Sequence, residues 1–196
     1  LFWIPVWFMV PMLTMRSIAE ERRIGTLATI LTTPVNAAEL VLSKFGAAYL
    51  NYLFLWLLTL TFPLLVHLYD PCIAEMGNLF NRSTLIGGYS FIALSGMLYI
   101  SIGLFASSLT RSQLIAGMLS FCILFIFTMG AKVLAQVPIL QSVETSGLSY
   151  MPDYFRTFRH LEDFTKGVLD TRPLFFYLSN ALLLLGLTTL IVRSKA

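Results

Sequence analysis

Charged residues are scarce in this sequence: they make up only 12% of it, about half the share found in soluble globular domains. Hydrophobic residues account for 57%, and the mean hydropathy is +0.80. This balance excludes an ordinary soluble domain and is typical of an integral membrane protein. The net charge is +3, but the basic residues are scattered among loops without interleaved aromatic residues, so no nucleic-acid-binding surface is expected.

The sequence also lacks the common motifs of catalysis and metal binding. Its two cysteines, Cys72 and Cys122, show neither zinc-site spacing nor a disulfide pattern. No G-x-x-x-x-G-K-[ST] loop, H-E-x-x-H helix or G-x-S-x-G elbow occurs, which excludes a P-loop ATPase and the usual metalloprotease and hydrolase sites. We therefore expect no enzyme activity, no metal site and no bound cofactor in this chain.

Long apolar runs dominate what is present. A helix needs roughly 20 residues to cross about 30 Å of hydrocarbon, because it rises about 1.5 Å per residue. The runs therefore predict an all-α, polytopic transmembrane helical bundle with about five spans. The predicted spans are residues 1–13, 46–68, 85–109, 114–135 and 174–192. Because the first run already begins at Leu1, we interpret it as the tail of a span that starts upstream.

Two of these runs carry a more specific expectation. Pro63 removes a backbone donor inside the run 46–68 and should kink that helix. The run 85–109 is rich in small residues, which let transmembrane helices approach closely, so this span is expected inside the bundle. These small residues are Gly87, Gly88, Ser95, Gly96, Ser101, Gly103 and Ser107. Only residues 110–113 separate this run from the next, which predicts an antiparallel helical hairpin.

The segment 136–173 is mostly polar. Its apolar residues recur at three- and four-residue steps, which predicts an amphipathic helix on the bilayer surface or against the outer end of the bundle. These residues are Phe155, Phe158, Leu161, Phe164 and Val168. The positive-inside rule places this segment outside, because the short loops of the opposite side hold more cations. Those cations are Arg16, Arg22, Arg23, Lys44, Arg111, Arg193 and Lys195.

A dense group of charges interrupts the apolar pattern within residues 14–45, which we call the charged segment. Its central charges are Glu20, Glu21, Arg22 and Arg23. In helical geometry they can point to water or to a protein partner, while a second set of side chains faces the bilayer. That second set is Ile18, Leu27, Ala28 and Leu31. The charged segment is therefore expected at the membrane face, between two spans.

Local signals divide the charged segment into short elements. Gly25 weakens the first helix, Thr26 can cap a second one, and Pro34 closes it, because the residue before a proline avoids the α region. Asn36 and Glu39 have capping-box spacing for the helix that leads into the next span. The residues alone leave two interpretations open: a docking element for a partner protein, or a solvated loop that only fixes topology.

The charged segment resembles a known family. It is similar to the segment between the second and third spans of type-2 ABC transporter permeases. The matching residues are Glu20, Glu21, Arg22, Arg23, Gly25, Thr26, Leu27, Leu31, Thr32, Thr33, Pro34, Val35, Glu39 and Lys44. The order of spans, short turn and long external segment is also similar, so the resemblance covers most of the chain.

Further details qualify this resemblance. Phe164, Gly167 and Asp170, which lead to Tyr177, are similar to the end of permeases in the gliding-motility-associated branch. The usual first of six spans and the cytoplasmic start of the family are missing, which suggests an N-terminal truncation. Ala28 occupies a position where the family often has an acidic residue.

The resemblance implies the membrane-spanning permease subunit of an ATP-driven exporter, a multi-pass protein of the bacterial inner membrane. ATP and Mg²⁺ would bind to a separate ATP-binding subunit, and a second permease copy, identical or different, would complete a dimer in the lipid bilayer. Closure of the ATPase subunits would push on a short coupling helix around residues 26–33, with residues 20–23 as its charged docking face. Substrate would pass between the two permease copies.

Two other classes of protein stay open. An ion-coupled secondary transporter would need ionisable groups within its spans, and the candidates are His67 and Lys132. Both lie close enough to a span end to reach the interface. A membrane scaffold or assembly factor would use the hairpin and the segment 136–173 only as binding surfaces.

Overall fold

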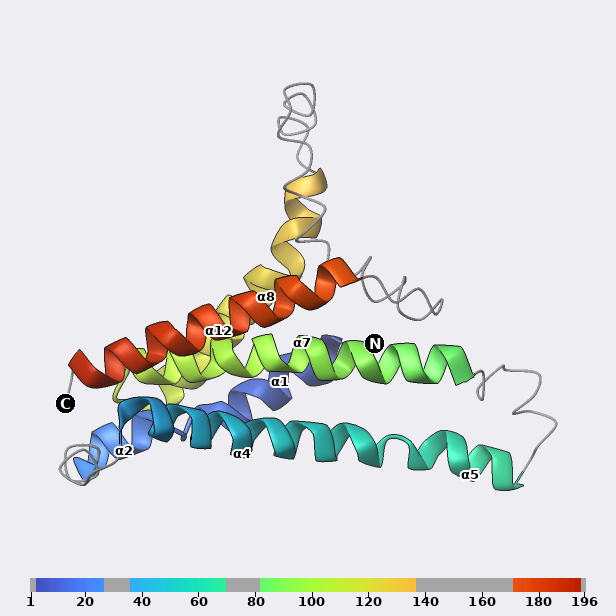
Figure 1. Cartoon of the computed structure of the whole chain (residues 1–196), viewed down its shortest axis with the longest axis horizontal. Helices are drawn as coiled ribbons and strands as arrows, with labels where there is room; N and C mark the ends of the chain where they lie inside the picture. The colour runs from blue at the N-terminus through green and yellow to red at the C-terminus, as the bar shows by residue number, and fades with distance from the viewer. Residues whose placement is uncertain (1–2, 27–35, 70–81, 137–170, 195–196) are drawn as a thin grey trace.

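A computed structural model describes residues 3–26, 36–69, 82–136 and 171–194, and these residues are all-helical, as the sequence predicts. The helices are α1 (Trp3–Thr14), α2 (Ala19–Ile24), α4 (Ala37–Leu58), α5 (Thr61–Tyr69), α7 (Arg82–Leu109), α8 (Gln113–Gln136) and α12 (Thr171–Ser194). In Figure 1, α7 lies between α12 and α4, and α2, the start of α4 and the end of α12 gather at one end of the bundle.

Four helices of the described chain are long and apolar enough to cross a membrane. They cover Ala37–Leu58, Leu85–Leu109, Gln113–Gly130 and Pro173–Ser194. The last three match predicted spans closely, and the first overlaps the predicted span 46–68. The run at residues 1–13 forms α1, which has 12 residues and packs against α8, α7 and α4. The predicted amphipathic helix within 136–173 lies almost entirely outside the described residues.

The apolar run 46–68 differs from its prediction at both ends and in the middle. Its helix begins earlier, at Ala37, and it is broken at residues 59–60 into α4 and α5. At the break the N–H of Leu60 bonds to the carbonyl of Leu57 at 3.1 Å, a tighter three-residue step. Thr59, in the break, lies four residues before Pro63. In a regular helix its carbonyl would accept the N–H of residue 63, but a proline has none. The N–H of Phe62 bonds to this carbonyl instead, at 3.2 Å.

The helix α7 forms the centre of the bundle, as its small residues predict. Within its membrane-length window, 72% is buried in the bundle, whereas only 22–28% is buried in the windows of the other three membrane-length helices. Two glycines permit this packing: a Cβ atom on Gly96 would lie 2.3 Å from the ring of Tyr52, and one on Gly103 would lie 2.3 Å from the hydroxyl of Thr14. The neighbours of α7 therefore occupy the space that a side chain would fill.

The predicted hairpin is present: α7 and α8 pack against each other and are joined by residues 110–112. The helix α8 has a buried face at four-residue steps, formed by Ala116, Ser120, Leu124 and Thr128. A different face is exposed and apolar, with Leu114 at 77%, Met118 at 71% and Ile126 at 68% exposure. Such a face is suited to contact with lipid or with another membrane subunit.

Candidate functional site

The candidate site is the part of the charged segment that begins after α1 and continues into α4. The helix α2 has six residues, with Glu20 and Glu21 in its first turn and Arg22 and Arg23 in its last. This order of charges complements the helix dipole. Gly25 ends the helix with φ +83°, in the left-handed region that favours glycine, and its N–H bonds to the carbonyl of Glu21 at 3.0 Å.

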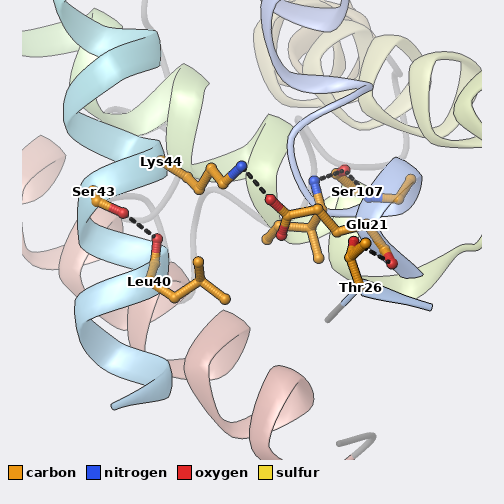
Figure 2. Close-up of polar contacts among 8 residues, drawn as sticks. Glu21, Thr26, Leu40, Ser43, Lys44 and Ser107 are labelled. Carbon is orange, nitrogen blue, oxygen red and sulfur yellow. Dashed lines mark hydrogen bonds and ion pairs between the residues drawn. The ribbon is translucent and has the colours of Figure 1, made fainter. Parts of the chain in front are cut away.

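A serine from α7 caps the start of α2. The hydroxyl of Ser107 accepts the N–H groups of Ile18 at 3.2 Å and of Ala19 at 3.0 Å, as Figure 2 shows. Both donors are buried and belong to the first turn of a helix, where the backbone offers no partner. The same hydroxyl lies 3.4 Å from the carbonyl of Met15, to which it donates. The fixed start of α2 thus depends on one side chain from a distant helix.

An ion pair links α2 to α4. In Figure 2 the ammonium group of Lys44 reaches the carboxylate of Glu21. The two side chains are only 18% (Glu21) and 32% (Lys44) exposed, so the pair is shielded from solvent more than a surface salt bridge. The second carboxylate oxygen of Glu21 is buried and has no partner among the described residues. Losing Lys44 would therefore leave a poorly solvated charge.

Arg22 links α2 to the end of α7. Its guanidinium group donates to the carbonyl of Ser108. Partial burial lowers the pKa of Arg22, and the nearby positive charge of Arg111 lowers it further. Arginine stays charged at neutral pH despite such a shift, because its pKa is far above 7.

The other two charges of α2 form a looser pair. Arg23 lies 4.0 Å from Glu20, and their side chains are 60% and 35% exposed. Ile24, the last residue of the helix, is 63% exposed. The helix α2 thus has an inner pair of charges, Glu21 and Arg22, and an outer pair, Glu20 and Arg23.

This arrangement differs from the sequence-based expectation in two ways. All four charges were expected to point away from the bundle, yet Glu21 and Arg22 make contacts within it. The prediction that Ile18 faces the bilayer is wrong, because this side chain is 1% exposed and belongs to the core. Ser107 holds the start of α2 against α7, which buries Ile18. Lys44 and Ser108 are the partners that draw Glu21 and Arg22 inward.

The start of α4 follows its prediction more closely. The backbone N–H of Asn36 donates to a carboxylate oxygen of Glu39 at 3.2 Å, the contact expected of a capping box. Lys44 lies two turns further along α4. Thr26, expected to cap a following helix, bonds with its hydroxyl to the carbonyl of Glu21 at 3.3 Å and so helps to close α2.

Some predicted residues lie outside the described ones: Leu27, Pro34, Phe164, Gly167 and Asp170. In contrast, no sequence pattern indicates that Ser107 and Ser108 belong to this site. Ser107 was noted only as a small packing residue, and no local signal marks a serine as the cap of a helix 88 residues away. Within the described ranges, no three His, Cys, Asp or Glu residues gather as a metal site.

Comparison with known proteins adds one finding. The model of a family described as "ABC-2 family transporter protein" matches residues 1–159. The match includes the whole charged segment and the helices α1 to α8, and it ends before Phe164. No curated protein and no solved structure matches the chain significantly.

Proposed function

The chain belongs to the ABC-2 transporter family, and we propose that it couples ATP hydrolysis on a separate subunit to the export of a substrate. Membership makes it an integral, multi-pass membrane protein and a permease component of an ABC transporter, the non-catalytic part of that machine. The partner of the proposal is an ATP-binding subunit, which carries ATP and Mg²⁺. A second permease copy, identical or different, completes the path, in a bacterial inner membrane.

The observation that carries this proposal is the double attachment of α2. The pair Glu21–Lys44 ties it to α4, and Ser107 and Ser108 tie it to α7. Both α4 and α7 contain membrane-length apolar helices. A displacement of α2 must therefore either break these contacts or move the ends of two spans. A solvated loop that only fixes topology would not need such contacts.

The outer face of α2 supplies the docking surface in this proposal. Glu20, Arg23 and Ile24 are at least one-third exposed, and the ion pair of Glu20 lies within α2, with Arg23. The helix α2 itself lies at one end of the bundle (Figure 1). The coupling helix expected around residues 26–33 directly follows α2 in the sequence and, apart from Thr26, lies outside the described residues. ATP-driven closure of the partner subunits would push on it, and the inner contacts of α2 would pass the force to α4 and α7.

The finer assignments rest on resemblance alone. Phe164, Gly167 and Asp170 resemble the gliding-motility-associated branch, and we include that branch in the proposal. They lie beyond the matched residues 1–159. The direction of transport, export, likewise comes from the family resemblance.

The proposal is tested by looking for a gene of an ATP-binding-cassette protein beside the gene of this chain and co-expressing the two proteins. Reversing both outer charges, Glu20→Arg with Arg23→Glu, should abolish co-purification of the two subunits while leaving membrane insertion intact. Ser107→Ala should preserve co-purification but reduce the substrate exported per ATP hydrolysed in proteoliposomes, because α2 is then loosely attached. Ser43→Ala is the matched control, since Ser43 bonds only within its own helix, to the carbonyl of Leu40.

Three results would contradict the proposal. Transport that continues without any ATPase subunit, driven by an ion gradient, would identify a secondary transporter. Unchanged co-purification in the outer charge-reversal variant would show that α2 is not the docking surface. Equal coupling in Ser107→Ala and Ser43→Ala would show that force does not pass through α2.

A further inference from the structure

Two arginines approach each other at the charged end of the bundle. Arg22 donates to the carbonyl of Ser108, in the last turn of α7, and Arg111 lies three residues further on, in the turn that joins α7 to α8. The hydrogen bond to Ser108 thus places Arg22 at the same corner of the bundle as Arg111. The pKa of Arg22 is lowered, first by its partial burial and then by the positive charge of Arg111. Two positive charges at one corner of a membrane bundle create a potential that attracts an anion.

The described part of the chain supplies no such anion. It contains three acidic residues, Glu20, Glu21 and Glu39. Glu21 pairs with Lys44, Glu20 lies beside Arg23, and Glu39 caps α4 through Asn36. Neither Arg22 nor Arg111 forms an ion pair with any described residue.

The surroundings of Arg111 are apolar and exposed. Leu109 before it is 39% exposed, and Leu114 and Ile115 after it are 77% and 56% exposed. These residues belong to two membrane-length helices, so Arg111 lies where the spans leave the hydrocarbon. An anion bound at Arg111 would therefore lie within about one helical turn of exposed apolar side chains.

We infer that Arg22 and Arg111 together bind the phosphate group of an anionic phospholipid, whose acyl chain covers Leu114 and Ile115. Guanidinium groups match phosphate oxygens with paired hydrogen bonds, and an arginine near the surface adds attraction to anionic lipids. A lipid is favoured over an acidic group of a partner protein, because a phospholipid carries its anion and its apolar chain in one molecule, at the depth where Arg111 and Leu114 lie. This site is separate from the ATPase docking surface proposed above.

The test uses the purified permease in detergent, without its ATPase subunit, and titrates it with phosphatidylglycerol or with neutral phosphatidylcholine. Native mass spectrometry counts the bound lipid and gives an apparent affinity. Wild type should prefer phosphatidylglycerol. The double variant Arg22→Gln with Arg111→Gln should bind it about 25-fold more weakly, since each arginine that meets the phosphate contributes roughly fivefold.

Two single variants are matched controls. Arg23→Gln removes a charge from the same helix, and Arg193→Gln removes one from the same end of the bundle, in the last turn of α12. Both should bind phosphatidylglycerol within a factor of about two of wild type. The double variant Arg22→Lys with Arg111→Lys retains the charges and should keep most of the affinity, which separates loss of the site from misfolding.

Several outcomes would overturn the inference. Equal binding of the two lipids by wild type would show that the anion is not recognised. Undiminished phosphatidylglycerol binding in the double Gln variant would place the lipid elsewhere. If inorganic phosphate displaces phosphatidylglycerol at equal concentration, the arginines bind a free anion, not a lipid. If the double Gln variant binds lipid normally but no longer co-purifies with a co-expressed ATPase subunit in a separate experiment, the arginines belong to a protein interface.

Discussion

The helices α7 and α4 are both long enough to cross a membrane, but they occupy opposite environments. In α7 72% of the membrane-length window is buried, whereas in α4 the value is 22%. Apolar character does not explain this difference, because the windows of α8 and α12 are at least as apolar as that of α7 but only 22–28% buried. What separates α7 from α4 is side-chain size: α7 offers Gly96 and Gly103 to its neighbours, while α4 exposes Leu50 and Phe54.

This difference shows how the bundle is held together. Lipid tails are as apolar as leucine, so hydrophobicity does not draw one membrane helix to another, and close packing and hydrogen bonds decide which helix is central. The same helix also fixes the candidate site, because Ser107 and Ser108 at its end bind α2. Contacts with α7 should therefore matter more than equivalent positions on α4.

The largest difference is expected between two serines. Ser107→Ala on α7 removes the acceptor of two buried N–H groups, those of Ile18 and Ala19, and should lower the free energy of unfolding by about 2–4 kcal/mol. Ser43→Ala on α4 should change it by less than about 0.5 kcal/mol, because that hydroxyl bonds within its own helix. Unfolding by SDS in mixed micelles measures both. Equal losses would refute the cap on α2.

A pair of glycines gives the next largest difference. In Gly103→Ala the new methyl group would meet Thr14, whose hydroxyl is already bonded to the carbonyl of Val10 at 2.8 Å, so we expect a loss of about 1–3 kcal/mol. Around Gly46 on α4 a Cβ atom meets nothing within 4 Å. Gly46→Ala should therefore leave stability unchanged or raise it by up to about 1 kcal/mol, through helix propensity. Unfolding by SDS measures both variants. If Gly46→Ala is destabilising and Gly103→Ala is not, the comparison between α4 and α7 is wrong.

The sequence predicted the central position of α7 and the hairpin with α8, because small residues and a short link act locally. It also predicted the end of α2 at Gly25 and the contact of Glu39 at the start of α4, which depend on neighbouring residues. These features needed no knowledge of distant parts of the chain.

The tertiary contacts of the candidate site were not predictable in this way. A helical projection places Glu21, Arg22 and Ile18 relative to α2 itself, but not relative to α4 and α7. Their inward orientation comes from Lys44, Ser107 and Ser108, which lie far away in the sequence. The break before Pro63 was anticipated as a kink, but its position at residues 59–60 depends on which carbonyl loses its donor.

The inner and outer charges of α2 should differ by a smaller amount. Glu21→Gln should cost about 1–2 kcal/mol, between the values for surface and buried ion pairs, because Lys44 would lose its partner in a partly buried place. A double-mutant cycle with Lys44→Met isolates the coupling energy of the pair. Glu20→Gln, cycled with Arg23→Gln, should give less than about 0.5 kcal/mol. If the outer pair couples as strongly as the inner one, the two-sided description of α2 is incorrect.

The smallest expected effect lies where α4 itself meets α7. At the helix break the hydroxyl groups of Thr59 and Tyr89 are 2.9 Å apart, in an exposed position. A double-mutant cycle of Thr59→Val and Tyr89→Phe should give a coupling energy of about 0.6 kcal/mol, the typical value for a hydrogen bond between membrane helices. Thr189→Val serves as control, since Thr189 bonds only to Gly186 of its own helix. If Thr59 and Tyr89 couple more strongly than Glu21 and Lys44, α4 is attached to α7 chiefly at the break. Movement of α2 would then reach only the half of α4 that begins at Ala37.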